Sequence, residues 1–185
     1  MRTCRLHITG PSGGGVTTLG RAVADALAIS NHDTDDYFWL PTDPPYCEKR
    51  PITDRLRLMH ELFLDRAEWV LSGSLDGWGD QLIPRFDLVV LVYAATEVRL
   101  QRLRVREALR FGADAVAEGG SRQQELNDFL EWASHYDDGV GVGRHLQRHE
   151  AWLAKLPCRV LRVDGTQTTA ELVGQVLAAI GRAHG

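Results

Sequence analysis

The sequence predicts an α/β protein in which helices cover both faces of a parallel β-sheet. Apolar runs of strand length alternate with amphipathic runs of helix length along the 185 residues. The run at 87–93 is continuous and β-branched, which is typical of a strand buried inside a parallel sheet. No repeat, low-complexity tract or interdomain linker interrupts the pattern. We therefore expect one domain spanning 1–185.

The elements are predicted in alternating order. Strands are expected at 4–9, 69–73, 87–93 and 158–163, with a further short element at 28–33. Helices are expected at 16–28, 53–67, 96–111 and 144–156, and after positions 121 and 168. Loops are expected at proline-rich 40–51, at 112–120, which should be mobile because it is rich in glycine, and at 137–143.

The ends of several helices carry residues that favour capping. Thr53 or Asp54 can cap the helix that follows the proline-rich loop. The patterns at 121–124 (Ser-x-x-Gln) and 168–171 (Thr-x-x-Glu) are capping boxes, in which two side chains satisfy the first free N–H groups of a helix. Gly181 is expected to end the last helix.

A glycine-rich turn, Gly10-Pro11-Ser12-Gly13-Gly14-Gly15, joins the first strand to the first helix. Such a turn points successive N–H groups into one concavity, and the helix N-terminus adds about half a positive charge there. The spacing Gly10-x4-Gly15-x-Thr17 is that of the P-loop, but Val16 stands where that motif has lysine. The predicted nucleotide-binding residues here are Gly10, Ser12, Gly13, Gly14, Gly15, Val16, Thr17 and Thr18. The alternative is a glycine-rich turn without a ligand.

With this turn at its start, the chain resembles the small P-loop kinases of the adenylate, shikimate and uridine kinase group. The resemblance runs from Gly10 to the turn at 164–166. It implies a three-layer fold with a five-stranded parallel sheet in the order 2-3-1-4-5, a substrate-binding segment at 36–67 and a mobile lid at about 110–143. It also implies ATP and Mg²⁺ as cofactors, with the Thr17 hydroxyl meeting the metal.

The acidic segment after the second strand resembles two kinase motifs. Asp33-Thr34-Asp35 is similar to the D-x-D of shikimate-type kinases, and Asp35-Asp36-Tyr37-Phe38 to the D-D-F-[YF] of uridine kinases. The first resemblance implies that Asp33 holds Mg²⁺ and that Asp35 is a catalytic residue contacting the acceptor hydroxyl. Phosphoryl transfer needs such positioned charge. The alternative is an exposed acidic turn.

Further candidates for substrate binding are Tyr37 and Arg50. The aromatic rings of Tyr37, Trp39 and Tyr46 can either stack on a ring of the substrate or pack in the core, and the sequence leaves both open. Arg50 or Lys49 can meet an anionic substrate.

Arginines line one face of the helix at 96–111. Arg102 and Arg106 match the pair that begins the lid in adenylate kinase-like proteins, where they contact adenine and phosphates, so they are predicted to be catalytic and, for Arg102, nucleotide-binding. For Arg99, Arg104 and Arg110 a solvated basic face is favoured.

The turn after the last strand carries the remaining nucleotide-site candidates. The resemblance implies that Gly165 and Thr166 pack against adenine; a plain turn is the alternative. His145 and His149 lie four residues apart on a helix, but no third metal ligand is evident, so ordinary surface histidines are expected.

The charge and the cysteine content of the chain limit the kinds of partner and compartment that we expect. The formal net charge of −4 argues against a general binder of nucleic acid or membranes. Three dispersed cysteines indicate a reducing compartment without disulfides, and no signal segment or membrane span is evident, so a cytoplasmic protein is expected. The predicted partners are a nucleotide and a small-molecule acceptor, with a monomer or weak dimer as the assembly.

The sequence thus predicts an ATP-dependent phosphotransferase acting on a small acceptor, either a nucleoside or nucleotide or a small hydroxy compound. The alternative is a nucleotide-binding module whose P-loop, lacking lysine, supports little or no transfer. Arg102, Arg106 or Arg50 can supply the missing cation when a lid closes.

Overall fold

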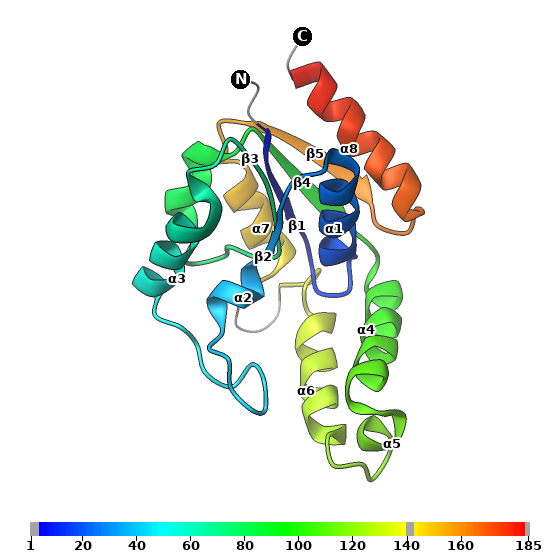
Figure 1. Ribbon diagram of the computed structural model, residues 1–185. Helices are drawn as coiled ribbons and strands as arrows, with labels where there is room; N and C mark the ends of the chain where they lie inside the picture. The colour runs from blue at the N-terminus through cyan, green and yellow to red at the C-terminus, as the bar shows by residue number, and fades with distance from the viewer. Residues whose placement is uncertain (1–3, 140–142, 184–185) are drawn as a thin grey trace.

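The computed structural model describes residues 4–139 and 143–183, and its centre is a five-stranded parallel sheet (Figure 1). The strands are β1 (Cys4–Thr9), β2 (Asn31–Asp33), β3 (Glu68–Ser72), β4 (Leu88–Tyr93) and β5 (Arg159–Asp164). Their order in the sheet is β2-β3-β1-β4-β5, and every neighbouring pair is parallel. The predicted order 2-3-1-4-5 is therefore confirmed.

The helices alternate with these strands. The longer ones are α1 (Val16–Leu27), α3 (Ile52–Met59), α4 (Thr96–Phe111), α6 (Gln123–Ser134), α7 (Leu146–Leu153) and α8 (Thr169–Ala183). Shorter helical segments are α2 (Thr34–Phe38), the π-helical turn η1 (His60–Leu64), the 3₁₀-helix η2 (Asp80–Arg85) and α5 (Ala113–Val116). No described helix combines the length and apolarity that crossing a membrane requires.

Successive side chains of β4 point to opposite faces of the sheet, and the core has two halves, one on each face. Val90 and Val92 face the layer formed by α1 and α8, whereas Val89 and Leu91 face the layer that contains α3 and α7 (Figure 1). Because both faces are covered, β4 is apolar at every buried position, as its sequence predicts. The two layers fix the sheet rigidly, and its carboxyl edge carries the loops that form the site.

Helices α4 and α6 extend together beyond the sheet at its carboxyl edge, with α5 at their far end (Figure 1). Leu103, Leu130 and Ala133 form a small apolar cluster of their own between α4 and α6. This arm covers most of the stretch predicted as a lid at about 110–143; positions 140–142 lie outside the described residues. The predicted loop at 112–120 is wrong in part, because 113–116 is helical.

The capping predictions had mixed outcomes. The box at 168–171 is confirmed, because the Thr168 N–H donates to Glu171 Oε2 at 2.9 Å and the Glu171 N–H donates back to Thr168 Oγ1 at 3.3 Å. The box at 121–124 is wrong: α6 begins at Gln123, whose own Oε1 accepts from the Gly119 N–H at 2.8 Å.

Two further helix ends differ from the prediction. Neither Thr53 nor Asp54 caps α3, since the helix begins one residue earlier, at Ile52, after Pro51. Pro51 has a fixed φ and its carbonyl accepts from the Asp54 N–H, so the first turn forms without a side-chain cap. At the other end of the chain, Gly181 does not stop α8, which continues to Ala183.

Candidate active site

The glycine-rich turn lies at the carboxyl edge of the sheet, between β1 and α1. Gly13 has φ +79°, and a Cβ added there would come within 2.6 Å of the Arg99 carbonyl oxygen. At Gly10, an added Cβ would collide with the Val92 carbonyl oxygen. The turn can therefore pack against β4 and α4 only with glycine at these positions. It closes with a hydrogen bond from the Gly14 N–H to the Pro11 carbonyl at 3.0 Å.

A cavity of about 610 Å³ opens above this turn. Its walls come from the turn, the start of α1, the acidic segment after β2, the end of β3 and the arm. The lining residues are Gly10, Pro11, Ser12, Gly13, Gly15, Val16, Thr17, Thr18, Arg21, Asp33, Asp35, Asp36, Tyr46, Gly73, Ser74, Arg102, Leu103, Arg106, Arg110 and Arg144. Segments far apart in the sequence thus meet in a concavity of suitable size for a small ligand.

The predicted metal pair is adjacent. The Thr17 hydroxyl donates to Asp33 Oδ2 at 3.0 Å, and both residues line the cavity. Asp33 also caps α2, since its Oδ1 accepts from the Asp35 N–H at 3.1 Å. Hydroxyl and carboxylate oxygens are donors of the kind that Mg²⁺ prefers, so these two residues could hold the metal that the resemblance implies.

The Asp35 carboxylate faces the same cavity beside two other carboxylates. Burial by surrounding atoms raises the pKa of Asp35 above its usual value, and the charges of Asp33 and Asp36 raise it further, while Arg144 and Arg106 act in the opposite direction. A carboxylate whose proton affinity is raised is better suited to accept a proton from a hydroxyl than an ordinary exposed aspartate is.

Arginines form the opposite wall. The Arg102 guanidinium donates to the Gly165 carbonyl at 2.9 Å, and its Nη1 is the atom nearest the position of a Cβ on Gly15. Arg106 pairs with Glu107 at 2.8 Å. The prediction that Arg102 and Arg106 share a site with the glycine-rich turn thus agrees with the cavity lining.

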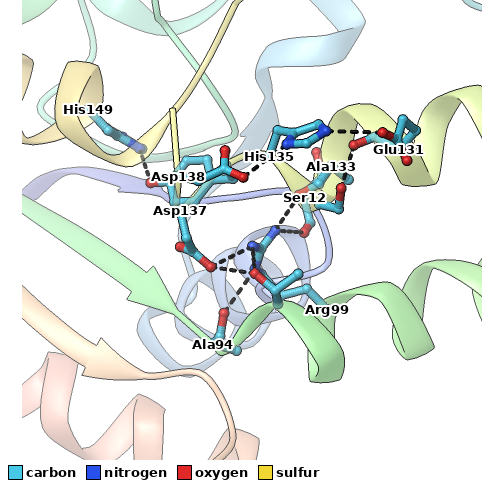
Figure 2. A network of polar contacts seen from close by, with 12 residues as sticks. Ser12, Ala94, Arg99, Glu131, Ala133, His135, Asp137, Asp138 and His149 are labelled. Carbon is cyan, nitrogen blue, oxygen red and sulfur yellow. Dashed lines mark hydrogen bonds and ion pairs between the residues drawn. The ribbon is translucent and has the colours of Figure 1, made fainter. Parts of the chain in front are cut away.

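Of the three arginines predicted to form a solvated face, Arg99 is not solvated, whereas Arg110 and Arg104 are exposed. Arg99 is fully buried, and its guanidinium donates to Ala94 O at 2.9 Å, to Ala133 O at 3.1 Å and to Asp137 Oδ2 at 3.1 Å (Figure 2). It faces inward because α4 places it over the end of β4, directly against the glycine-rich turn. Arg110 lines the cavity and donates to the Tyr46 hydroxyl at 3.2 Å. Arg104 is exposed, as predicted.

Of the two histidines predicted to be surface residues, His149 differs from the prediction, whereas His145 is half exposed at the start of α7. His145 caps the helix, accepting the Arg148 N–H at its Nδ1. His149 is buried: its Nδ1 contacts the Tyr136 hydroxyl at 2.9 Å and its Nε2 contacts Thr9 Oγ1 at 3.1 Å. Burial and the nearby Arg144 charge lower the pKa of His149 to about 4, so it is neutral at physiological pH.

The structure does not bring two of the predicted substrate residues to the cavity. Tyr37 is buried in the core against Phe63, with its hydroxyl 2.9 Å from His32 Nδ1, because it lies on the inner side of α2. Arg50 instead donates to the Trp39 carbonyl at 3.3 Å. Neither lines the cavity, so the structure does not place these two predicted substrate residues with Asp35.

The two residues of the turn after β5 that were predicted to pack against adenine, Gly165 and Thr166, differ in where the structure places them. Gly165 lies against the glycine-rich turn, because a Cβ on it would come within 2.5 Å of the Gly14 carbonyl oxygen. Gly165 is thus close to the site without lining the cavity. Thr166 is exposed and donates to Asp164 Oδ1 at 2.7 Å, which favours the plain-turn interpretation for its side chain.

Arg144 and Arg21 are cavity residues that the sequence reasoning missed. Arg144 Nη2 donates to Ser12 Oγ of the glycine-rich turn at 2.9 Å. Its position depends on how the chain returns from α6 to α7, and no local sequence pattern predicts that connection. Arg21 follows Thr17 by one helical turn on α1, so the i, i+4 spacing alone could have placed it at the site.

Comparisons with known proteins agree with this architecture. The chain is 41% identical over 172 residues to the Bacillus subtilis (strain 168) "Uncharacterized protein YqaC", covering 93% of this chain and 94% of the relative. It is 30% identical over 114 residues to a cytidylate kinase of Archaeoglobus fulgidus, covering 62% of that protein. No protein-family model matches the chain.

Among solved structures, a shikimate kinase from Acinetobacter baumannii in complex with shikimate superposes with a TM-score of 0.54, at 20% identity, over 96% of this chain and 93% of that one. A gluconokinase from Sinorhizobium meliloti gives a TM-score of 0.53, at 17% identity, over 98% and 94%. At such identities these likenesses define the fold. The chain therefore belongs to the same family as YqaC and has the fold of the P-loop small-molecule kinases.

Proposed function

We propose that the protein transfers the γ-phosphoryl group of ATP, bound with Mg²⁺, to a hydroxyl or phosphate of a small molecule. The observation that carries this proposal is the single cavity shared by the glycine-rich turn, the Thr17–Asp33 pair, Asp35 and the arginines of the arm. A phosphate cradle, a metal pair, an acceptor-side carboxylate and mobile cations are the parts that phosphoryl transfer needs.

Each part has a role in this proposal. The turn and the α1 N-terminus bind the β- and γ-phosphates. Thr17 and Asp33 hold Mg²⁺, which supplies charge neutralisation on the phosphates when bound. Asp35 accepts or orients the proton of the attacking hydroxyl, and Arg102 and Arg106 clamp phosphates from the arm, which serves as the lid. Gly165, held by Arg102, lies at the adenine side.

The arginines that line the cavity favour an acceptor that is an anion. Arg21 and Arg110 line the cavity in addition to Arg102, Arg106 and Arg144, which exceeds what the phosphates of one nucleotide require. The similar proteins include a shikimate kinase, a gluconokinase and a cytidylate kinase, and shikimate, gluconate and cytidylate are all anions with free hydroxyl groups or a phosphate. We therefore propose an anionic acceptor carrying a carboxylate or a phosphate.

Val16 favours a second candidate function, that of a nucleotide-binding module without transfer. Its side chain is largely buried among apolar neighbours of α1 and β1, so the turn itself contributes no cation. Losing one charge-assisted contact costs binding about 1.5–3 kcal/mol, and it can cost more in the transition state. The raised pKa of Asp35 favours the kinase, because a pure binder has no use for a proton acceptor at that place.

Calorimetric titration of the protein with ATP, with and without Mg²⁺, tests the proposal. We expect binding that improves when Mg²⁺ is present and that is weakened by Thr17→Ala. An assay for ADP release should then be run with shikimate, gluconate and cytidine monophosphate as acceptors. Binding of MgATP without acceptor-dependent ADP release would favour the binding module, and no binding at millimolar ATP would refute both functions.

A further inference from the structure

The turn of this protein has the shape of a phosphate cradle but lacks the cation that ordinarily completes it. Val16 lines the cavity, and its Cγ2 lies 3.1 Å from where a Cβ on Gly10 would be, so a packed apolar side chain stands at the position of the P-loop lysine. The charge that develops on the transferred phosphoryl group needs a nearby cation. Another element must therefore deliver it.

Most cavity arginines already have a polar partner. Arg102 donates to the Gly165 carbonyl, Arg106 forms an ion pair with Glu107, and Arg110 contacts the Tyr46 hydroxyl. Arg99, although next to the turn, is fully buried and paired with Asp137. These groups are held by the protein itself, so each would have to exchange that partner for phosphate.

Arg144 differs in where it is held. Its Nη2 donates to the hydroxyl of Ser12, inside the glycine-rich turn, at 2.9 Å, and its guanidinium stacks 5.7 Å from the Trp132 ring centre. No carboxylate lies within ion-pair distance of it in the part of the chain that the structure describes. The Ser12 hydroxyl is a neutral acceptor, so the charge of the guanidinium is offset only in part, by the nearby carboxylates of Asp35 and Asp76.

The surroundings of Arg144 also favour an anion. Burial lowers the pKa of Arg144, since the desolvated guanidinium is disfavoured, and the nearby charges of Asp35 and Asp76 offset that loss only in part. An arginine keeps its proton in proteins, so this penalty is relieved by binding a negative ligand rather than by deprotonation. A phosphate held by the turn is the ligand within reach.

We propose that Arg144 takes the place of the P-loop lysine, with Ser12 holding its guanidinium over the site of the transferred phosphoryl group. This inference rests on the proposed function and adds a catalytic residue to it. In the transfer, the bond from the γ-phosphorus to its bridging oxygen breaks and its electron pair stays on ADP. The acceptor oxygen bonds to phosphorus and its proton goes to Asp35. Arg144 stays protonated and neutralises the oxygens of the moving group.

Calorimetry on four proteins tests this: the wild type, Arg144→Ala, Arg148→Ala and the double variant Val16→Lys/Arg144→Ala. Arg148 is the matched control, because it lies one turn further along and pairs with Asp76 at 2.7 Å outside the cavity. We expect Arg144→Ala to weaken MgATP binding roughly 10- to 100-fold, the loss of one charge-assisted contact, and AMP binding far less. Arg148→Ala should bind MgATP as the wild type does.

The double variant should recover MgATP binding, because a lysine at position 16 supplies the cation that Arg144→Ala removes. Equal MgATP affinity of the wild type and Arg144→Ala would overturn the inference and leave the proposed function standing. So would a loss that Val16→Lys does not restore in a protein with an unchanged thermal midpoint. If the double variant does not fold, Arg144→Lys replaces it, with expected affinity between those of Arg144→Ala and the wild type. Absence of MgATP binding by the wild type overturns both proposals.

Discussion

At the scale of single residues, the Asp35 carboxylate is a functional group that costs stability. Burial and the charges of Asp33 and Asp36 raise its pKa, so the folded state binds its proton more tightly than the unfolded state does. By linkage, stability falls as the pH rises from the ordinary value of 3.8 through the raised pKa. At neutral pH the ionised carboxylate therefore destabilises the fold.

Asp35→Asn should have opposite effects on stability and on activity. We expect a higher thermal midpoint at pH 7, since the amide removes the repulsion without a change in size, and a phosphotransfer rate lower by at least about 100-fold. Scanning calorimetry and an ADP-release assay measure the two. Asp25→Asn, on the exposed side of α1, should change neither. A lower midpoint for Asp35→Asn, or intact transfer, would contradict the assignment.

At the scale of elements, Arg99 joins four segments whose relative positions define the cavity. Its guanidinium reaches the end of β4 through Ala94, the end of α6 through Ala133 and the following turn through Asp137 (Figure 2). The backbone of Arg99 also lies against Gly13 of the glycine-rich turn. One side chain thus fixes the base of the arm relative to the phosphate cradle.

Arg99→Met should lower the free energy of unfolding by about 2–4 kcal/mol, because three buried or half-buried oxygen atoms lose their charged donor. Urea denaturation measures this change. Arg104→Met, on the exposed side of the same helix, serves as the matched control and should stay within about 0.5 kcal/mol of the wild type. Equal effects of the two substitutions would show that Arg99 is not the anchor described here.

Periodicity predicted the elements well, and it failed where tertiary contacts decide. The bounds of α4 follow from its pattern because the whole helix is long and regular. The arginines on it could not be sorted from spacing alone: Arg99 and Arg102 share a face, yet one lies in the core and the other lines the cavity. Which of them is buried depends on the position of α6, which the sequence does not specify locally.

At the scale of the whole molecule, the sequence predicted the parts of the site that lie in one short segment. The turn, Thr17 and Asp33 could be found because strand, turn and helix have a fixed local order, and Asp33 meets Thr17 once β2 is in the sheet. Arg144 could not, since it lies 132 positions after Ser12, the residue of the turn that it contacts. Tyr37 and Arg50 were misplaced because an aromatic or basic residue near a site has the same pattern whether it faces the ligand or the core.

Two buried histidines make the stability of the whole fold depend on pH. His7 lies on the sheet side facing α7, stacked on Phe86, and burial lowers its pKa to about 3. His149, which lies nearby, has its pKa lowered to about 4 by burial and Arg144. The unfolded chain binds a proton at each near the ordinary value of 6.5, so stability is fully present above that value and is lost as the pH falls towards the folded pKa values.

We expect the free energy of unfolding to fall by about 2 kcal/mol per histidine between pH 7 and pH 5. His7→Phe should remove about half of this loss, because the phenyl ring can stack on Phe86 and carries no titrating group. Phe86→Leu disturbs the same packing but leaves the imidazole in place, so it should lower stability equally at both pH values. Urea denaturation at pH 5 and pH 7 compares the three proteins. If His7→Phe kept the full pH dependence, His7 could not be one of its sources, and His149 or exposed groups would have to carry it.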